Sequence, residues 1–121
     1  MPIRDGRMIE RRAETRLLCS DLIKIRLEGA RPRELTANLE DISTSGACLQ
    51  LEEPLPLEAR VCLLCRRCRF RGKVKYCVYN EIGYFIGVRF QAGQKWSRER
   101  YEPKHLLDPT QVLPSRPSPV C

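Results

Sequence analysis

The sequence predicts an all-β protein, a small six-stranded antiparallel β-barrel followed by a short C-terminal helical segment and a disordered tail. Three observations support this fold class: short segments alternate apolar with polar residues, turn residues separate them, and no helical apolar pattern lies between them. Closing such a sheet into a barrel also pairs the strand edges that would otherwise face solvent.

The first strand is predicted over residues 23–27, where isoleucine and leucine alternate with lysine and arginine. A turn with Gly29 and Pro32 follows, and then a second strand over about residues 34–39. Each strand has one apolar face, as expected for a sheet that is buried on one side only.

Residues 41–46, Asp-Ile-Ser-Thr-Ser-Gly, are predicted to be a strand that runs into a tight turn. The apolar residues of the second strand fall at odd positions, whereas Ile42 falls at an even one. That change of register predicts a bulge or bend at Asp41. The alternation restarts in a third strand over about residues 47–51.

Two prolines, Pro54 and Pro56, then interrupt the pattern, because proline cannot sit in a central strand. An apolar fourth strand is predicted over residues 61–65, and a fifth strand with the clearest alternation follows. Its inward side chains are predicted to be Cys68, Phe70, Val74, Tyr76 and Val78. Its outward side chains are predicted to be Arg69, Arg71, Lys73 and Lys75. After a turn at residues 80–83, the inward row of the last strand is Tyr84, Ile86, Val88 and Phe90.

The chain ends are predicted to differ from the barrel. Residues 1–10 are expected to form a flexible basic leader, residues 11–93 the barrel domain, and residues 94–121 a helical turn or two and a proline-rich disordered tail. Four apolar residues after the last strand are expected to fold back over one barrel end: Trp96, Tyr101, Leu106 and Leu107.

Composition restricts the classes of function. The 121 residues suit one domain, and 22 Lys and Arg against 15 Asp and Glu leave a net charge of +7. This excess favours an anionic partner such as a nucleotide, a nucleic acid or a membrane surface. The start has no secretory pattern, and no apolar run approaches the roughly 20 residues of a membrane span. We therefore expect a cytoplasmic protein without a membrane span.

Seven cysteines lie mostly within apolar strand patterns, and we expect reduced thiols rather than a disulfide framework. The run Cys62, Cys65 and Cys68 has metal-like spacing, but zinc needs four ligands, usually from two separated pairs, and no second CxxC exists. Cys77 follows too late for an iron–sulfur pattern. No metal site is expected. Cys65 and Cys68 could still face each other across a turn as a redox pair.

Arginines upstream of the 41–46 turn carry the most specific chemistry. Arg12 and Arg16 form an RxxxR pattern, preceded directly by Arg11. A guanidinium is a planar, permanently charged fork that can grip phosphate oxygens or the O6 and N7 edge of guanine, and it can stack on a purine. A carboxylate such as Asp41 suits the opposite guanine edge, which offers N–H donors.

With these motifs the sequence resembles the PilZ domain family, whose members bind cyclic di-GMP. Arg12 and Arg16 match the family's RxxxR motif, and residues 41–46 match its DxSxxG motif about two dozen residues later. The closing residues 86–90 look like the final strand of such domains. The resemblance covers roughly residues 10–91 and implies a bacterial second-messenger receptor.

The family's roles carry over by position. The resemblance implies that Arg12 and Arg16 bind the phosphates and guanine Hoogsteen edges of the ligand. It implies that Asp41 and Ser43 contact guanine or phosphate, and that Gly46 permits the turn and close approach.

The position before RxxxR also has a meaning in the family. An arginine there, here Arg11, is associated with two stacked ligands rather than one. One departure concerns the C-terminal region, which is short and interrupted by prolines, whereas many relatives carry a distinct helix there. A helix-mediated dimer is therefore not expected.

These features together predict a stand-alone cyclic di-GMP receptor. Ligand binding would draw the arginine leader onto the barrel mouth, and the reshaped surface would meet a protein partner. The alternatives are a basic barrel that binds nucleic acid along its outward cationic row, or an interaction module that binds no ligand. We expect no enzyme and no cofactor besides the ligand, because no nucleophile–base pair, P-loop or pair of catalytic acids is apparent.

Overall fold

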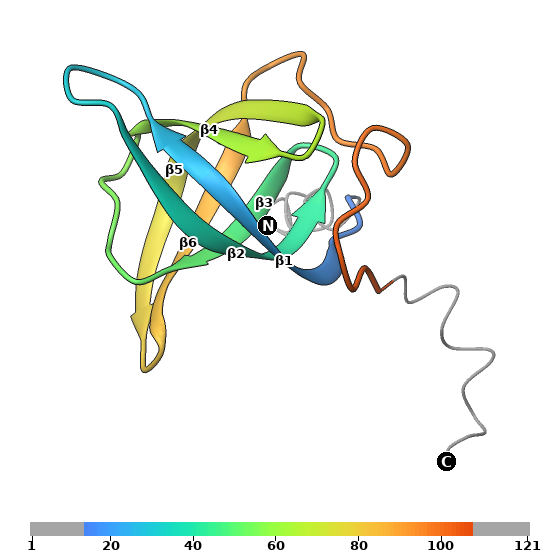
Figure 1. The fold of residues 1–121 in the computed structure, drawn as a ribbon, viewed down its shortest axis with the longest axis horizontal. Helices are drawn as coiled ribbons and strands as arrows, with labels where there is room; N and C mark the ends of the chain where they lie inside the picture. The colour runs from blue at the N-terminus through green and yellow to red at the C-terminus, as the bar shows by residue number, and fades with distance from the viewer. Residues whose placement is uncertain (1–13, 108–121) are drawn as a thin grey trace, which may run out of the picture.

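The computed structural model describes residues 14–107, in which six antiparallel strands close into a barrel (Figure 1). The strands are β1 (Leu17–Leu27), β2 (Arg33–Ser43), β3 (Gly46–Leu51), β4 (Arg60–Cys65), β5 (Cys68–Asn80) and β6 (Gly83–Phe90). Around the barrel their order is β1-β2-β3-β6-β5-β4. The predicted all-β barrel is confirmed. The predicted leader over residues 1–10 and the tail beyond residue 107 lie outside the described residues.

The strands begin and end close to the predicted limits, with β1 as the main exception. It starts at Leu17 rather than Ile23, because Cys19 and Asp21 continue the buried row of the strand. An aspartate in a buried row breaks the apolar alternation, so the pattern concealed the first half of β1. The structure compensates the buried carboxylate with hydrogen bonds, as burial of a charge requires.

Side chains from all six strands fill the barrel. The largest fully buried ones include Phe70, Ile25, Leu39, Leu49 and Leu63. Phe70 also stacks on Phe90, with 5.0 Å between ring centroids. Large apolar side chains therefore exclude solvent from the centre, and ligand chemistry is confined to the outer surface and the rims.

The bulge predicted at Asp41 is confirmed, since the β2–β3 register shifts between Leu39 and Asp41. Leu39 and Ile42 are both fully buried although three positions separate them. One extra residue inverts the alternation of a strand, so the bulge returns Ile42 to the core.

The inward assignment of Tyr76 and Val78 is wrong. The β5–β6 register shifts between Val74 and Tyr76, and beyond that point Tyr76 and Val78 are 39% and 52% exposed, while Cys77 packs against the core. A second bulge therefore inverts the faces of β5 halfway along. Before the shift, Phe70 and Val74 are buried as predicted, and the four basic side chains of the outward row are exposed.

The segment after β6 covers one end of the barrel without forming a helix in the described residues. Over the expected helical residues 94–101 there is a single turn, in which the amides of Arg100 and Tyr101 donate to the Ser97 carbonyl. Trp96 and Tyr101 are buried and join the core as predicted. So short a segment cannot sustain a helix by itself, and tertiary contacts set its path.

The remaining two predicted apolar contacts differ from each other. Leu106 packs against the core, whereas Leu107 is 42% exposed. Leu107 is held through its backbone instead, because its amide donates to the Leu18 carbonyl at 2.8 Å.

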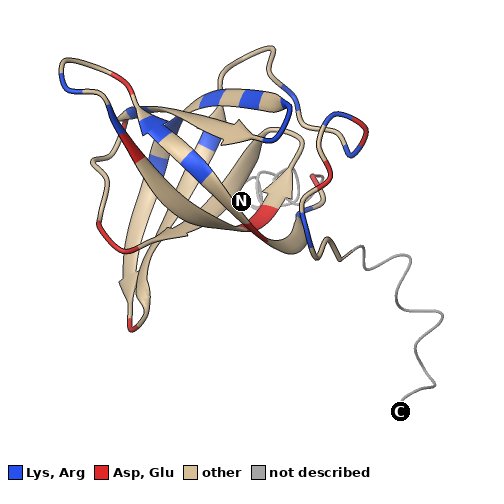
Figure 2. Cartoon of the chain, viewed as in Figure 1, with Lys and Arg blue, Asp and Glu red and all other residues tan. Residues whose placement is uncertain are grey.

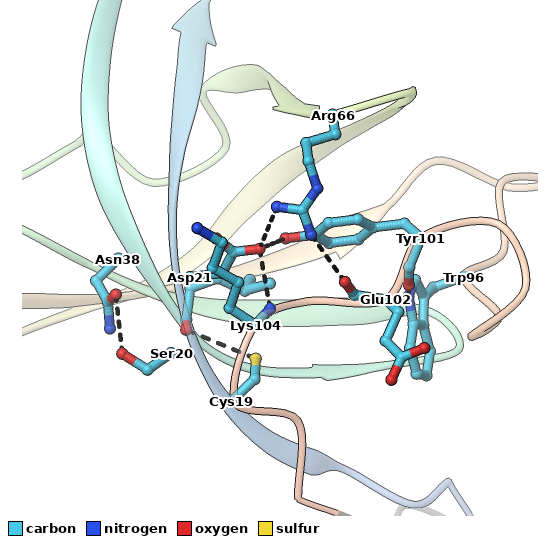
Figure 3. A network of polar contacts seen from close by, with 10 residues as sticks. Cys19, Ser20, Asp21, Asn38, Arg66, Trp96, Tyr101, Glu102 and Lys104 are labelled. Carbon is cyan, nitrogen blue, oxygen red and sulfur yellow. Dashed lines mark hydrogen bonds and ion pairs between the residues drawn. The ribbon is translucent and has the colours of Figure 1, made fainter.

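Asp21 fastens this segment to the barrel (Figure 3). Its Oδ2 accepts hydrogen bonds from the Tyr101 hydroxyl at 2.7 Å, the Lys104 amide at 3.1 Å and the Arg66 guanidinium at 3.2 Å. Burial acts to raise the pKa of Asp21, but these bonds and the charge of Arg66 lower it below its usual value. One carboxylate thus joins β1, the β4–β5 turn and the C-terminal segment.

Asp21→Asn should destabilise the fold by about 2 kcal/mol at neutral pH, because a charged acceptor of three hydrogen bonds is lost. The folded-state pKa of Asp21 is lowered, so its contribution is present above the unfolded-state pKa and is lost as the pH falls through the folded-state pKa. Urea unfolding at pH 7 and near pH 3 should therefore show a difference between native and variant that shrinks in acid. Tyr101→Phe, which removes one donor only, should cost less. An equal difference at both pH values would contradict this role.

Candidate functional site

The β2–β3 hairpin forms the centre of the candidate site. Ser43 pairs with Gly46 across a two-residue turn, Thr44-Ser45, so the DxSxxG motif is the end of one strand, the turn and the start of the next. A β-carbon added at Gly46 would lie 2.7 Å from the Val88 carbonyl oxygen of β6, and Gly46 has no left-handed φ. A glycine is therefore required at position 46 because the β6 backbone approaches closely there, and not because of the conformation of the turn.

Arg16 lies beside Asp41, 25 residues later in the chain, with 3.3 Å between guanidinium and carboxylate. The Asp41 side chain is only 14% exposed, whereas that of Arg16 is 59% exposed. The neighbouring carboxylate raises the pKa of Arg16. Burial raises the pKa of Asp41, and Arg16 offsets this only in part. The partly buried acid is thus held in place, while the guanidinium of its partner is largely exposed.

The carboxylate of Glu14 binds to the β2–β3 hairpin. Its Oε1 accepts hydrogen bonds from Ser43 Oγ at 2.9 Å, Ser45 Oγ at 2.8 Å and the Ser45 amide at 3.3 Å. Burial acts to raise the pKa of Glu14, but the bonds from Ser45 and Ser43 and the charge of Arg89 lower it. Two hydroxyls and a backbone N–H converging on one anion form a small anion-binding site at the hairpin.

A row of residues crosses four strands next to this hairpin. Asp41 pairs with Cys48, Cys48 with Gly87, and Gly87 with Tyr76. The Tyr76 ring covers Gly87, since a β-carbon at Gly87 would lie 2.1 Å from the ring. Burial, and then hydrogen bonding with Cys48, raises the pKa of Tyr76 to about 12, so the phenol is neutral.

The structure brings together four of the six residues predicted for the site: Arg16, Asp41, Ser43 and Gly46. Arg11 and Arg12 lie outside the described residues. Ser43 is 7% exposed and bonds both Glu14 and the Gly46 carbonyl.

Sequence reasoning missed Glu14, Tyr76 and Gly87. Gly87, inside a strand pattern, was the available signal, because an isolated strand glycine often marks a close approach. Glu14 lies inside the RxxxR motif, but nothing near it in the sequence indicated that it would contact the hairpin. Tyr76 was assigned to the wrong face.

The PilZ domain family model matches residues 10–102, which is most of the chain and includes all six strands. The chain belongs to the PilZ domain family. This is a family of binding and effector domains known to bind cyclic di-GMP. A comparison with curated proteins gives no match.

The cysteines of this PilZ domain are free thiols at the six positions that the structure describes. Cys65 and Cys68 are opposite each other in the register of β4 and β5, on either side of the turn, as expected. Burial raises the pKa of Cys65 to about 12, which keeps this thiol protonated and unreactive at neutral pH. Within residues 14–107, no three His, Cys, Asp or Glu side chains are grouped so that they could hold a metal ion. The same residues include no helix with the length and apolarity of a membrane span.

Gly46→Ala should destabilise the PilZ domain by about 1–3 kcal/mol, because the new methyl group would press on the β6 backbone, which cannot move as a side chain can. Where space is open, Gly→Ala stabilises a chain by about 0.4–1 kcal/mol, so the sign of the change is informative. Thermal unfolding of native and variant chains measures it. A variant as stable as the native chain, or more so, would contradict the close-approach role of Gly46.

Proposed function

We propose that this PilZ domain is a cyclic di-GMP receptor whose ligand binds at the β2–β3 hairpin. The observation that carries the proposal is the contact between Arg16 and Asp41 beside the Ser43 hydroxyl, which joins the two motifs at one place. Family membership supports the same ligand. The match to both motifs supports the individual roles.

The groups at the hairpin suit the two halves of a guanine nucleotide. Guanine presents N–H donors on one edge, which a fixed carboxylate such as Asp41 accepts, and O6 and N7 acceptors on another, which a guanidinium such as Arg16 binds with two parallel bonds. The hydroxyls and the amide at residues 43–45 offer donors to a phosphate. Arg11 and Arg12, which directly follow the leader, would add positive charge beside the phosphates, and Arg11 favours a stacked ligand pair.

Glu14 suggests how binding could be coupled to the leader. Its carboxylate uses the donors of Ser43 and Ser45, which a ligand phosphate would also need. A bound phosphate would therefore displace Glu14, and Arg16 would exchange part of its contact with Asp41 for the ligand. Ligand binding would thus rearrange the residues that join the leader to the barrel. A protein partner would then recognise the changed surface.

Arg16→Ala should weaken cyclic di-GMP binding by about 2 kcal/mol or more, roughly thirtyfold, because a charge-assisted contact is removed. Asp41→Ala should weaken it as well, by removing the guanine acceptor. Titration calorimetry compares the variants with Arg33→Ala, which removes the same charge from an exposed arginine paired with Glu53 at the other end of β2. The control should bind as the native chain does. Unchanged affinity in Arg16→Ala would refute the proposed site.

Glu14→Gln should tighten cyclic di-GMP binding by about 1 kcal/mol, or fivefold, because a competing anion leaves the hairpin. The folded-state pKa of Glu14 is lowered, so competition is complete above its usual pKa and fades as the pH falls through the folded value. The advantage of Glu14→Gln should therefore shrink in acid. Glu53→Gln, an exposed glutamate elsewhere, is the matched control. Weaker binding by Glu14→Gln would show that Glu14 supports the ligand rather than competing with it.

Nucleic-acid binding along the outward row of β5 is the less favoured alternative. Figure 2 shows Lys and Arg in blue along this part of the barrel, yet acidic neighbours accompany them. Lys75 and Lys73 lie 2.7 and 3.9 Å from Glu58, and Arg71 lies 3.9 Å from Glu28. A phosphate backbone would have to compete with these acids, and its binding would fall steeply with salt for any sequence.

A further inference from the structure

Three cationic residues lie side by side across β4, β5 and β6. In the register of these strands Arg60 is directly opposite Lys73, and Lys73 is directly opposite Arg89. All three residues are exposed, so this cationic row lies on the outer face of the barrel. Like charges directly opposite each other on one face of a sheet repel and lower its stability. An anion lying over the row would remove that repulsion.

The chain supplies little counter-charge to the cationic row. Within residues 14–107, neither Arg60 nor Arg89 forms an ion pair with a carboxylate, and the ion pair between Lys73 and Glu58 is long, at 3.9 Å. The charge of Arg89 acts on the Glu14 carboxylate only over a longer range, where it helps to lower the pKa of Glu14. The row thus remains open to an anion from solution.

The cationic row lies in a hollow of about 490 Å³ on this side of the barrel. This volume is within the range of roughly 300–1,000 Å³ that is typical of small-molecule sites. A β-carbon added at Gly72 would collide with the Arg89 carbonyl oxygen, so β5 and β6 approach closely here. Five basic residues contribute to the lining: Arg60, Arg71, Lys73, Lys75 and Arg89.

The spacing of the cationic row indicates the size of the anion. Adjacent strands are about 5 Å apart, so three neighbouring strands place the outer two charges about 10 Å from each other. A single phosphate cannot contact all three side chains, whereas a chain of linked phosphates can. The guanidinium groups of Arg60 and Arg89 can each hold phosphate oxygens with two parallel bonds, and the Lys73 ammonium acts as a point charge between them.

Two further observations favour a short anion over a nucleic-acid strand. A strand would extend beyond the row onto Arg71 and Lys75, which are already paired with Glu28 and Glu58. The hollow also lacks a surface on which bases could stack, because Phe90, the aromatic residue of its lining, is buried. Recognition here would therefore concern phosphate charge and not a base.

We propose that the hollow over β4–β6 is a second ligand site, which binds an oligophosphate, a chain of two or more linked phosphates. The chain could be inorganic or belong to a nucleotide, and the two sources share the same contacts. Inorganic tripolyphosphate, ATP and GTP should therefore bind with similar affinity, whereas a preference for either nucleotide would contradict recognition through phosphate alone. The site is separate from the proposed cyclic di-GMP site, because it uses no residue of the two motifs.

Calorimetric titration with inorganic tripolyphosphate at one fixed ionic strength tests the site. Lys73→Met keeps the length of the side chain but removes the central charge, and affinity should fall about tenfold or more. Arg69→Met is the matched control, because Arg69 is an exposed arginine of the same strand outside the hollow. It should bind as the native chain does, and so should Arg16→Ala, which removes a charge at the hairpin.

Thermal unfolding separates loss of the site from loss of the fold. Without ligand, Lys73→Met should unfold at the same temperature as the native chain or higher, because two like-charge oppositions are removed. Tripolyphosphate should raise the unfolding temperature of the native chain, and the variant should lose most of this rise.

Four outcomes would overturn the inference. The native chain might fail to bind tripolyphosphate at physiological ionic strength. An equal loss in Lys73→Met and Arg69→Met would show non-specific attraction to a basic surface. A loss in Arg16→Ala without one in Lys73→Met would move the anion to the hairpin. Tighter binding of a single-stranded oligonucleotide than of tripolyphosphate would assign this face to nucleic acid.

Discussion

Strand register is the constraint on which the site depends. Side chains alternate strictly between the two faces of a sheet, so a single extra residue moves every side chain beyond it to the opposite face. Two such irregularities, at Asp41 in β2 and before Tyr76 in β5, lie on strands that flank β3 and β6. The first keeps Ile42 in the core beside a polar hairpin, and the second turns Tyr76 outward. Without both, the polar hairpin and the aromatic ring would not share one surface.

The charges at the hairpin form a compact set that is satisfied within the chain. Asp41 is paired with Arg16, and Glu14 is held by the serines of the turn. A partly buried carboxylate next to an exposed guanidinium is well suited to exchange of partners, because the acid is already in place and only the exposed arginine must move. If the proposed ligand binds here, part of its binding energy would be spent on replacing these internal contacts.

Much of the fold was predictable because its signals are local. Alternation in β2–β6, the prolines before β4 and the change of register at Ile42 all appear within a few residues of the elements they define. The failures share a cause: Asp21 is buried through bonds to Tyr101 and Lys104, some 80 residues away, and the β5 bulge appears only in the pairing with β6. The RxxxR and DxSxxG motifs indicated Arg16, Asp41, Ser43 and Gly46, whereas Glu14 acquired a role only through contact with the hairpin.

The sequence by itself determined the family, the barrel and the residues of the two motifs, because hydrophobic periodicity and motif spacing are written along the chain. Tertiary structure alone decided that Arg16 meets Asp41, that Glu14 fills the Ser43–Ser45 anion site, and that the Tyr76 ring lies over Gly87. Those contacts join strands that are distant in sequence, and closure of the barrel sets which of them become neighbours.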